Sequence, residues 1–284
     1  MRSRLLVLAA ALTLGLTSFA AAGCGDDDEE DGTATTSESS GSGDETASLE
    51  LLSEGVLTLG VDTPYPPFEF GDAPDYDGYD IDVANAIADE LGLETEFIDA
   101  PFDVILAGAP GRFDLSVAAT TITDARENRV DFSDPYFEAE QSLLVQTDGE
   151  IASIDDITAD SVVAGQDGTT GETYASENTD AEVRPFPEID DAYNALVSGQ
   201  VDAVFNDLPA NTQAVEDKPG LEVVETFSTD EQYGIVFPED STLVEPINEA
   251  LQTIKDDGTL GEIYAEWFDE EVPEDVLSAT HDPS

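Results

Sequence analysis

From Leu51 onward, short apolar runs alternate with segments in which apolar residues recur every three or four positions. Runs of the first kind are typical of buried strands, and segments of the second kind are typical of helices that pack one face on a sheet. In 81–91, for example, the apolar residues fall on one helical face, and Gly92 follows as a C-cap. This alternation predicts a layered α/β fold. Strands are expected at 57–61, 94–98, 114–119, 142–146, 161–165, 182–186, 201–206, 221–225 and 232–237, and helices at 81–91, 171–178, 189–198, 209–216, 243–256 and 259–268.

The first 23 residues have the composition of a secretory signal peptide. Arg2 and Arg4 precede an uncharged apolar stretch that ends in small residues before Cys24. The alternative is an uncleaved membrane anchor, since the stretch is nearly long enough to span a bilayer. Cys24 is the only cysteine and stands at the expected cleavage point, which favours removal of residues 1–23. The site resembles the lipobox of bacterial lipoproteins, in which this cysteine is lipidated, although Ala21 stands where that motif usually has Leu.

The segment after Cys24 is acidic and polar. Residues 25–47 contain no large apolar side chain. Such a segment cannot bury enough surface to offset the entropy that ordering would cost. We therefore expect 24–50 to be a flexible tether that begins at the lipidated cysteine and holds a soluble domain just outside a membrane.

Acidic residues outnumber basic ones by 66 to 8, and the formal net charge is −58. A field of this sign excludes nucleic acid as a partner. Two explanations of the acidity stay open: an ordinary acidic exported protein, or adaptation to high salt, which screens repulsion within about 3 Å at molar ionic strength. His281 is the only histidine, so clustered His or Cys ligands are missing and neither a metal centre nor a cofactor is expected.

Residues 120–126, TTITDAR, place one of the few cations where a helix should begin. Thr123 and Asp124 are good N-cap residues, and the first N–H groups of a helix have no internal partner. Arg126 adds a planar cationic fork that fits a carboxylate. From this segment alone, an anion-binding seat and a capped helix with a solvated arginine are equally open.

Seven motifs in a fixed order carry a resemblance to a known family. They are DTPYPPFEF (62–70), GYDIDVANAIADELG (78–92), DLSVAATTITDAR (114–126), VDFSDPY (130–136), GQDGTTGETYA (165–175), SGQVDAVFNDLPA (198–210) and DGTLGEIYAEWF (257–268). Over about residues 51–270, the chain resembles the extracellular solute-binding proteins of polar amino-acid ABC transporters.

That family has the two-lobed type II periplasmic-binding-protein fold. The resemblance therefore implies an α/β chain in which each lobe is a central sheet flanked by helices, and in which two extended hinge strands connect the lobes. Ligands in such folds bind in the cleft, at strand ends and helix starts. The ranges expected from the resemblance are 51–142 plus 237–284 for the first lobe, 147–231 for the second lobe, and 142–147 and 231–237 for the hinge strands.

The motif match assigns four residues to the carboxylate of an amino-acid ligand. Arg126 would make a bidentate contact, and Thr121 would add backbone and hydroxyl contacts. The N–H groups of Gly168 and Thr169, which open a helix in the opposite lobe, would meet the same carboxylate. A glycine-threonine turn is by itself more often only a helix cap, so this role depends on the match with the family spacing.

The ligand ammonium is assigned to Asp207 and to the backbone carbonyl of Ala119. Asp207 followed by Pro209 is also a routine helix start, and the resemblance decides for ligand binding. The family often has Gly where Ala119 stands, so a Cβ there could narrow the approach to the ammonium.

Four residues occupy the positions that select the ligand side chain: Asp62, Tyr65, Phe102 and Gln166. Tyr65 and Phe102 would sandwich the side chain and exclude water. Core packing is the alternative for both aromatics, and more so for Phe102, whose segment is one residue short of the usual family spacing. Because no Lys or Arg stands at these positions, an acidic ligand is not expected, and glutamine, another polar amino acid or a basic one remains.

The expected function is that of a lipid-anchored, monomeric receptor at the extracellular face of the membrane or in the periplasm. It would bind a free amino acid between two closing lobes and deliver it to an ABC permease. One alternative is a sensory receptor that presents its ligand to a signalling partner. Another is a dehydratase, an activity of a few relatives with this fold, which would need a tuned acid or base in the cleft.

Overall fold

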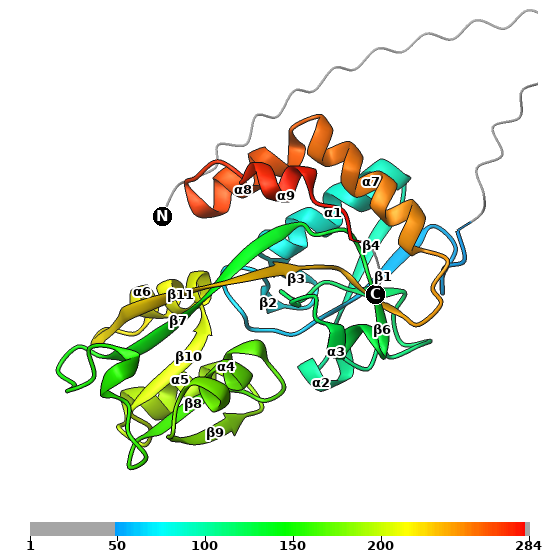
Figure 1. The fold of residues 1–284 in the computed structure, drawn as a ribbon. Coiled ribbons are helices and arrows are strands. Elements are labelled where there is room, and N and C mark those ends of the chain that lie inside the picture. Colours follow the sequence, from blue (N-terminus) through cyan, green and yellow to red (C-terminus); the bar gives the residue numbers. More distant parts are fainter. Residues whose placement is uncertain (1–48, 282–284) are drawn as a thin grey trace, which may run out of the picture. The chain divides into compact units, whose positions relative to one another are not determined.

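The computed structural model describes residues 49–281. The expected signal peptide, Cys24 and nearly all of the expected tether lie outside this range. The described chain forms two five-stranded sheets and a small two-stranded one, and helices pack on the larger sheets (Figure 1). In this part of the chain, no helix is both long enough and apolar enough to cross a membrane.

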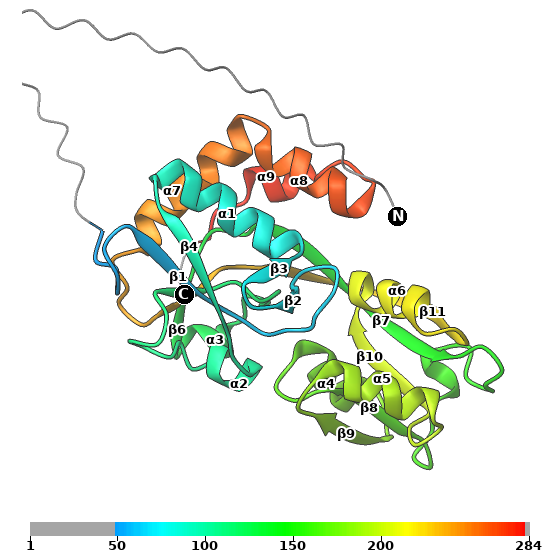
Figure 2. The same cartoon turned by 180° about the vertical axis from the view of Figure 1, so that it is seen from behind.

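The first lobe is built from the two ends of the described chain. Its elements are β1 (Val56–Val61), β2 (Phe70–Asp72), β3 (Asp75–Asp77), α1 (Tyr79–Leu91), β4 (Glu94–Asp99), α2 (Phe102–Ile105), β5 (Leu115–Ser116), α3 (Asp124–Glu127), β6 (Val130–Phe132), β12 (Val236–Pro238), α7 (Val244–Asp256), α8 (Thr259–Phe268) and α9 (Glu274–Ser278). The sheet order is β4-β1-β5-β12-β6, with β1 parallel to both of its neighbours. Strand β1 is almost entirely buried, as a central parallel strand must be, which explains its continuous apolar run. Helix α1 packs against α7 and α8 (Figure 2).

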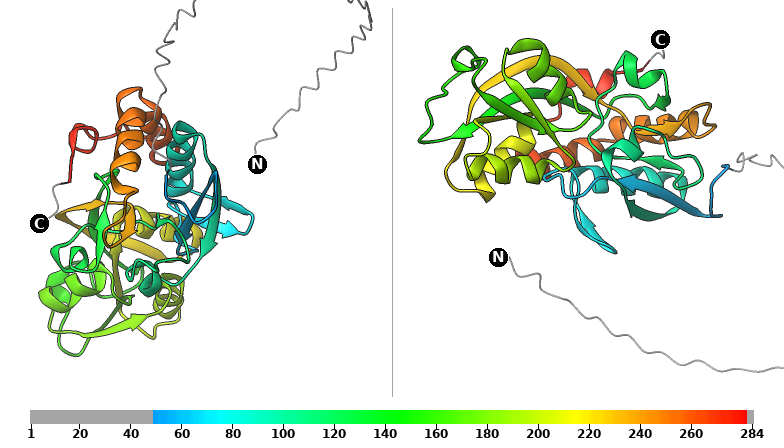
Figure 3. Two further views of the ribbon diagram at one scale, coloured as in Figure 1. Left: turned by 90° about the vertical axis from the view of Figure 1, so that its right-hand side faces the viewer. Right: turned by 90° about the horizontal axis from the view of Figure 1, so that it is seen from below.

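The second lobe comes from the middle of the chain. Its elements are β7 (Phe137–Gln146), a 3-10 helix (Ile154–Asp156), β8 (Val162–Gln166), α4 (Thr170–Asn178), β9 (Glu182–Phe186), α5 (Ile189–Val197), β10 (Ala203–Asp207), α6 (Leu208–Asp217) and β11 (Leu221–Tyr233). The sheet order is β11-β7-β10-β8-β9, in which β10, β8 and β9 run parallel and β7 runs antiparallel to β10 and β11. Figure 3 shows these green and yellow elements beside the blue, cyan and orange ones of the first lobe.

The long strands β7 and β11 connect the lobes and pair with each other through the crossing (Figure 1). The first crossing lies earlier than the range 142–147 expected from the sequence, because residues 141–145 already pair with β10 inside the second sheet. The chain leaves the first sheet after Phe132 and joins the second from Phe137. The return crossing runs from the end of β11 into β12, and Gly234 between them donates its N–H to Thr120 O (3.0 Å).

An aromatic cluster fills the region where the lobes join. Phe137, at the start of β7, lies 5.0 Å from Phe68, 5.2 Å from Tyr233 and 5.1 Å from Phe268, measured between ring centroids. Through this cluster a single apolar core continues from the first lobe into the second. The crossing strands are therefore anchored by buried side chains as well as by their backbone pairing.

Each helix expected from the periodicity is present, with ends that differ by a few residues. Helix α1 begins at Tyr79, two residues before the expected start, and ends at Gly92, which has the left-handed conformation (φ 68°) of a C-cap. The range 232–237 spans the end of β11 and the start of β12. The elements α2, β2, β3, β6 and α9 were not expected, since each is too short to show a periodic pattern. Helix α3 begins at Asp124 after the N-cap Thr123, where the TTITDAR segment predicted a helix start.

Candidate functional site

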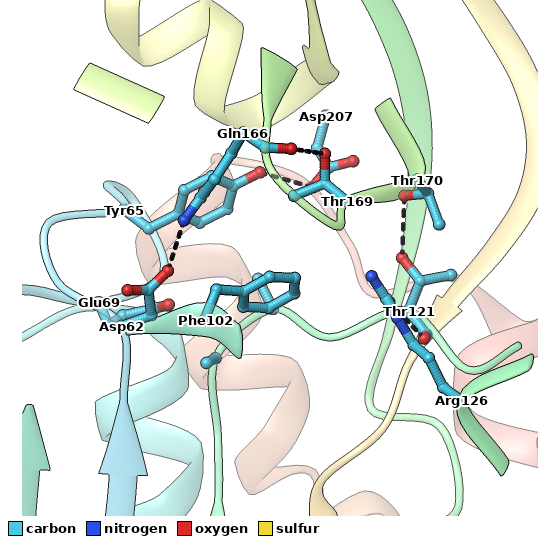
Figure 4. A pocket seen from close by; sticks show the side chains of 12 residues that line it. Asp62, Tyr65, Glu69, Phe102, Thr121, Arg126, Gln166, Thr169, Thr170 and Asp207 are labelled. Atoms are coloured by element: carbon cyan, nitrogen blue, oxygen red, sulfur yellow. Dashed lines mark hydrogen bonds between the residues drawn. The ribbon is translucent and has the colours of Figure 1, made fainter. Parts of the chain in front are cut away.

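A pocket with an empty volume of about 320 Å³ lies between the lobes, at strand ends and helix starts (Figure 4). Asp62 follows β1 directly, Gln166 and Asp207 are the last residues of β8 and β10, and Phe102 is the first residue of α2. Open α/β sheets generally bind ligands at these strand ends. The lining residues are Asp62, Tyr65, Glu69, Phe102, Ala118, Ala119, Thr121, Arg126, Gln166, Thr169, Thr170 and Asp207.

The structure brings nine of the ten predicted ligand-site residues together in this pocket, and Gly168 is the one that does not line it. Sequence reasoning missed Glu69, Ala118 and Thr170. Glu69 had a usable signal, because it is an ionisable residue between two phenylalanines in a motif whose aromatic positions suggest a core. Ala118 and Thr170 carried no chemical signal apart from their neighbours in the motifs.

One end of the pocket is cationic. Arg126 belongs to α3, whose N-cap Thr123 accepts a hydrogen bond from the Arg126 N–H. The guanidinium bridges the lobes: Nη1 donates to Thr121 O (2.7 Å) in the first lobe, and Nη2 donates to Gly168 O (3.1 Å) in the second. Its Cζ lies 5.4 Å from the centroid of the Phe102 ring, within cation–π range. Since a guanidinium has five N–H donors, it keeps capacity for a carboxylate.

The start of α4 faces this end but its amides are already engaged. Gly168 N–H donates to Glu172 Oε2 (2.8 Å), and Thr169 N–H donates to Gln166 O (3.3 Å). The Thr169 hydroxyl caps the helix by accepting the Glu172 N–H (3.2 Å). In this structure Gly168 therefore meets Arg126 through its carbonyl, whereas the role expected from the sequence uses its N–H.

Thr121 forms the wall between the two lobes. Its hydroxyl donates to Glu231 Oε2 (2.9 Å) on β11 and lies 3.5 Å from Thr170 Oγ1. Glu231 was not predicted as part of the site. It lies on a strand that the apolar pattern did not mark there, because the edge of β11 alternates between exposed and half-buried positions.

Asp207 is held by three hydrogen bonds. Tyr65 Oη and Tyr233 Oη each donate to Oδ2 (2.6 Å), and Gln141 Nε2 donates to Oδ1 (2.5 Å). Burial raises the pKa of Asp207 to about 6, with a further contribution from Glu231, against the lowering effect of these three donors. A carboxylate has about four acceptor sites, so Asp207 keeps the ability to accept a bond from an ammonium.

Ala119 has a backbone conformation that is unusual for a residue with a side chain. Its φ is 41°, in the left-handed region that favours glycine, and its N–H donates to Asp80 Oδ2 (2.7 Å). The residue is 7% exposed and borders the pocket. The conformation is held from outside the pocket, by Asp80 on α1.

The opposite end of the pocket is acidic. Asp62 is 6% exposed and accepts a hydrogen bond from Gln166 Nε2 (2.8 Å) of the other lobe. Burial raises the pKa of Asp62 to about 7; the Gln166 amide lowers it, and the nearby carboxylates Glu188, Asp99 and Asp103 raise it further. A group in this setting is stabilised by a cation, because a positive charge would relieve both the desolvation and the repulsion.

No cluster of three or more His, Cys, Asp or Glu side chains suited to a metal ion occurs within residues 49–281. The carboxyl groups of Asp62 and Asp207 are instead held by N–H and O–H donors. The site is arranged for a molecule that carries both an anion and cations.

Comparison with known proteins places the chain in a family. Residues 57–270 match the family of bacterial extracellular solute-binding proteins, family 3, and the chain belongs to it. It has the type II periplasmic-binding fold of amino-acid-binding proteins.

Three relatives show the range of ligands. The glutamine-binding protein GlnH of a Bacillus subtilis ABC transporter is 36% identical over 207 residues, which cover 70% of this chain and 75% of the relative. The solved arginine-, lysine-, histidine-binding protein ArtJ of Geobacillus stearothermophilus is 30% identical, with a TM-score of 0.72, over 78% of this chain and 98% of that one. An ancestral amino acid-binding protein, a precursor of cyclohexadienyl dehydratase, is 37% identical, with a TM-score of 0.69, over 75% of this chain and 95% of that one.

Proposed function

We propose that this protein is a receptor that binds a free polar or basic amino acid between its lobes and delivers it to an ABC permease. The observation that carries the proposal is the charge order along the pocket: one guanidinium at one end, and buried carboxylates beyond it. An α-amino acid needs this order, because its carboxylate and its ammonium require partners of opposite charge.

Arg126 and Thr121 hold the ligand carboxylate in this proposal. A hydrogen bond to a charged group contributes about 1.5–3 kcal/mol net, so a bidentate contact could supply much of a micromolar affinity. Gly168 and Thr169 add their N–H groups once Glu172 and the Gln166 carbonyl release them. Asp207 and the Ala119 carbonyl take the ammonium.

Asp62 and Gln166 meet the end of the ligand side chain, between Tyr65 and Phe102. Among the ligands left open by the sequence, the raised pKa of Asp62 favours a basic side chain over glutamine. The carboxylates around Asp62 repel an acidic side chain.

Lobe closure is the proposed mechanism. The lobes already contact each other across the pocket through Arg126 and Gly168. Two further contacts, between Tyr65 and Asp207 and between Gln166 and Asp62, are drawn in Figure 4. A ligand that exchanges these contacts for its own would favour the closed form by its differential affinity for that form, and the closed form would dock on the permease. We further propose lipid anchoring at Cys24, a location outside the cytoplasmic membrane or in the periplasm, and a monomeric state.

Isothermal calorimetry and thermal-shift measurements across the twenty amino acids test this proposal. We expect arginine, lysine or histidine to bind most tightly, glutamine more weakly, and glutamate least. Tighter binding of glutamate would overturn the ligand class. We expect no turnover of prephenate-type substrates, and sustained product formation would favour the dehydratase alternative. Transport that depends on a co-expressed permease would exclude a purely sensory role.

A further inference from the structure

Two buried carboxyl groups meet at the pocket wall, where Glu69 lines the pocket and Asp80 does not. Glu69, in the segment between β1 and β2, is 1% exposed, and Asp80, in the first turn of α1, is 0% exposed. Their side chains are hydrogen-bonding neighbours, and each has one buried oxygen, Glu69 Oε2 and Asp80 Oδ1, that meets no N–H or hydroxyl of the described residues. Two carboxylates have no hydrogen to share between them, so a hydrogen bond between these groups requires that one of them carries a proton.

The surrounding donors indicate which group is charged. Asp80 Oδ2 accepts the Ala119 N–H (2.7 Å) and the Tyr136 hydroxyl (3.0 Å). Asp80 Oδ1 and Glu69 Oε2 are buried, and neither receives a bond from an N–H or a hydroxyl of residues 49–281. The two donors to Asp80 Oδ2 stabilise the negative charge on Asp80. The carboxylic acid of Glu69 is then the donor that Asp80 Oδ1 needs.

We propose that Glu69 and Asp80 form a carboxylic acid–carboxylate pair that holds one proton and positions the Ala119 carbonyl toward the ligand ammonium. Both are positioning residues, since they act through the backbone of Ala119. The ligand half of this inference rests on the proposed function, whereas the proton itself belongs to the ligand-free protein.

The groups that face the pair are acidic or neutral. Asp62, at the end of β1, and Asp207, at the end of β10, are the other carboxyls whose charges act on Glu69, and Tyr65, Tyr79 and Tyr136 each interact with a member of the pair. Burial, followed by the charges of Asp80 and Asp62, raises the pKa of Glu69 well above its usual value. With no cation among these groups, a proton is what relieves the repulsion.

The pair explains how an alanine keeps a conformation that favours glycine. The Ala119 φ of 41° needs an anchor, and Asp80 supplies it through the Ala119 N–H. Loss of the shared proton would place two charges in contact, and their repulsion would move Asp80 from the Ala119 N–H. The carbonyl of Ala119 would then turn away from the pocket.

Three variants separate the proton from the charge. Glu69→Gln keeps a donor for Asp80 Oδ1 but cannot ionise, and Glu69→Ala removes the donor. Glu96→Gln, an exposed glutamate on β4, is the matched control for the loss of one acid. All are made in the chain without its signal segment, and circular dichroism verifies folding.

Unfolding without ligand tests the pair first. A raised folded-state pKa contributes stability that is complete below the unfolded pKa and is lost as pH rises through the folded one. We therefore expect the melting temperature of the wild type to fall from pH 5 to pH 9 relative to Glu69→Gln, and to run parallel to the Glu96→Gln control. Parallel curves for the wild type and Glu69→Gln would overturn the pair.

Calorimetry with arginine and with its des-amino analogue then tests the positioning role. We expect Glu69→Gln to bind arginine within about threefold of the wild type, and Glu69→Ala to lose about tenfold, as for one buried hydrogen bond. Binding of the analogue, which has no ammonium, should change little in either variant. Equal losses in folded Glu69→Gln and Glu69→Ala would overturn the pair, because the carboxylate charge itself would then be required. If the unfolding curves diverge but no amino acid binds, the pair stands and the proposed function fails.

Discussion

The two ends of the pocket solve opposite electrostatic problems. Arg126 is a cation in a strongly acidic chain, and it bridges the lobes by donating to the carbonyls of Thr121 and Gly168. Asp62 is a buried anion among further anions, held by a single side-chain amide from Gln166. The guanidinium donates its hydrogen bonds to neutral acceptors and is also stabilised by the charges of Asp207 and Glu231, whereas, within the described chain, the only charges that act on Asp62 are those of other carboxylates.

Under the proposed function, this difference orients the ligand and selects its class. If the Arg126 end takes the carboxylate, the side chain of an amino acid points toward Asp62. There a neutral polar group gains a hydrogen bond, and a basic group gains in addition the relief of desolvation and repulsion. The contrast therefore predicts that substitutions at the two ends differ both in how much affinity they remove and in which ligands they affect.

The largest expected effect comes from breaking the cationic end. Arg126→Ala removes the proposed bidentate partner of the ligand carboxylate, and two charge-assisted hydrogen bonds correspond to a loss of about 100-fold or more in affinity. Calorimetry should show this loss for arginine and glutamine alike, because every amino acid has the carboxylate. Arg129→Ala, an exposed arginine three residues further on, is the control and should bind as the wild type does. Unchanged binding by Arg126→Ala would place the carboxylate elsewhere.

A change at the acidic end should be smaller and selective. Asp62→Asn keeps an acceptor for Gln166 but removes the charge, so affinity for arginine or lysine should fall by about 10- to 100-fold. Affinity for glutamine should stay within about threefold, since its amide needs no charged partner. Competition between arginine and glutamine measures the ratio directly. Asp103→Asn, an exposed acid that only raises the pKa of Asp62 from a distance, should leave the ratio near that of the wild type.

The same contrast predicts a pH dependence that belongs to Asp62. With a pKa of about 7, Asp62 must lose a proton to pair with a cation below neutral pH. Affinity for arginine should therefore fall about tenfold from pH 8 to pH 6, and Asp62→Asn should show a flatter profile over that range. The ligand-free protein should show the opposite trend. The stability that Asp62 contributes to the ligand-free protein is complete below the unfolded pKa and is lost as pH rises through about 7. A wild-type affinity for arginine that is constant from pH 6 to pH 8 would contradict the assignment.

The parts of the molecule that the sequence predicted best are those with a long periodic signal. Helix α1 and strand β1 followed from apolar spacing, and the common pocket of Asp62, Arg126 and Asp207 followed from motifs that match a family residue by residue, while their roles toward a ligand stay predictions. The first hinge was placed too late, because Phe137 to Gln141 continue the same strand and only pairing with β10 shows where the second sheet begins. The sequence did not predict that the N–H groups of Gly168 and Thr169 already have acceptors inside the second lobe. The Gly168 N–H donates to the side chain of Glu172, a contact that residue spacing does not encode.

Glu69 shows a different limit. Its role depends on Asp80, 11 positions away, and on the other carboxyls whose charges act on it, which only the folded arrangement defines. A buried acid in an apolar motif is a signal for a special environment, but the sequence does not name its partner.

Ala119 lies between the two ends, and the smallest expected effect concerns its backbone. Glycine adopts a φ of 41° without the penalty of a Cβ, which is about 1–2 kcal/mol, but it loses about 0.5–1 kcal/mol through its freer unfolded chain. Ala119→Gly should therefore raise the free energy of unfolding by roughly 0.5–1 kcal/mol, measured by denaturant unfolding without ligand. Ala118→Gly is the matched control, because Ala118 is also buried and is not among the residues with positive φ. This variant should lose about as much stability as Ala119→Gly gains. If both changes destabilise equally, packing of the Ala119 methyl outweighs its strain, and the Asp80 contact then holds a conformation that costs little.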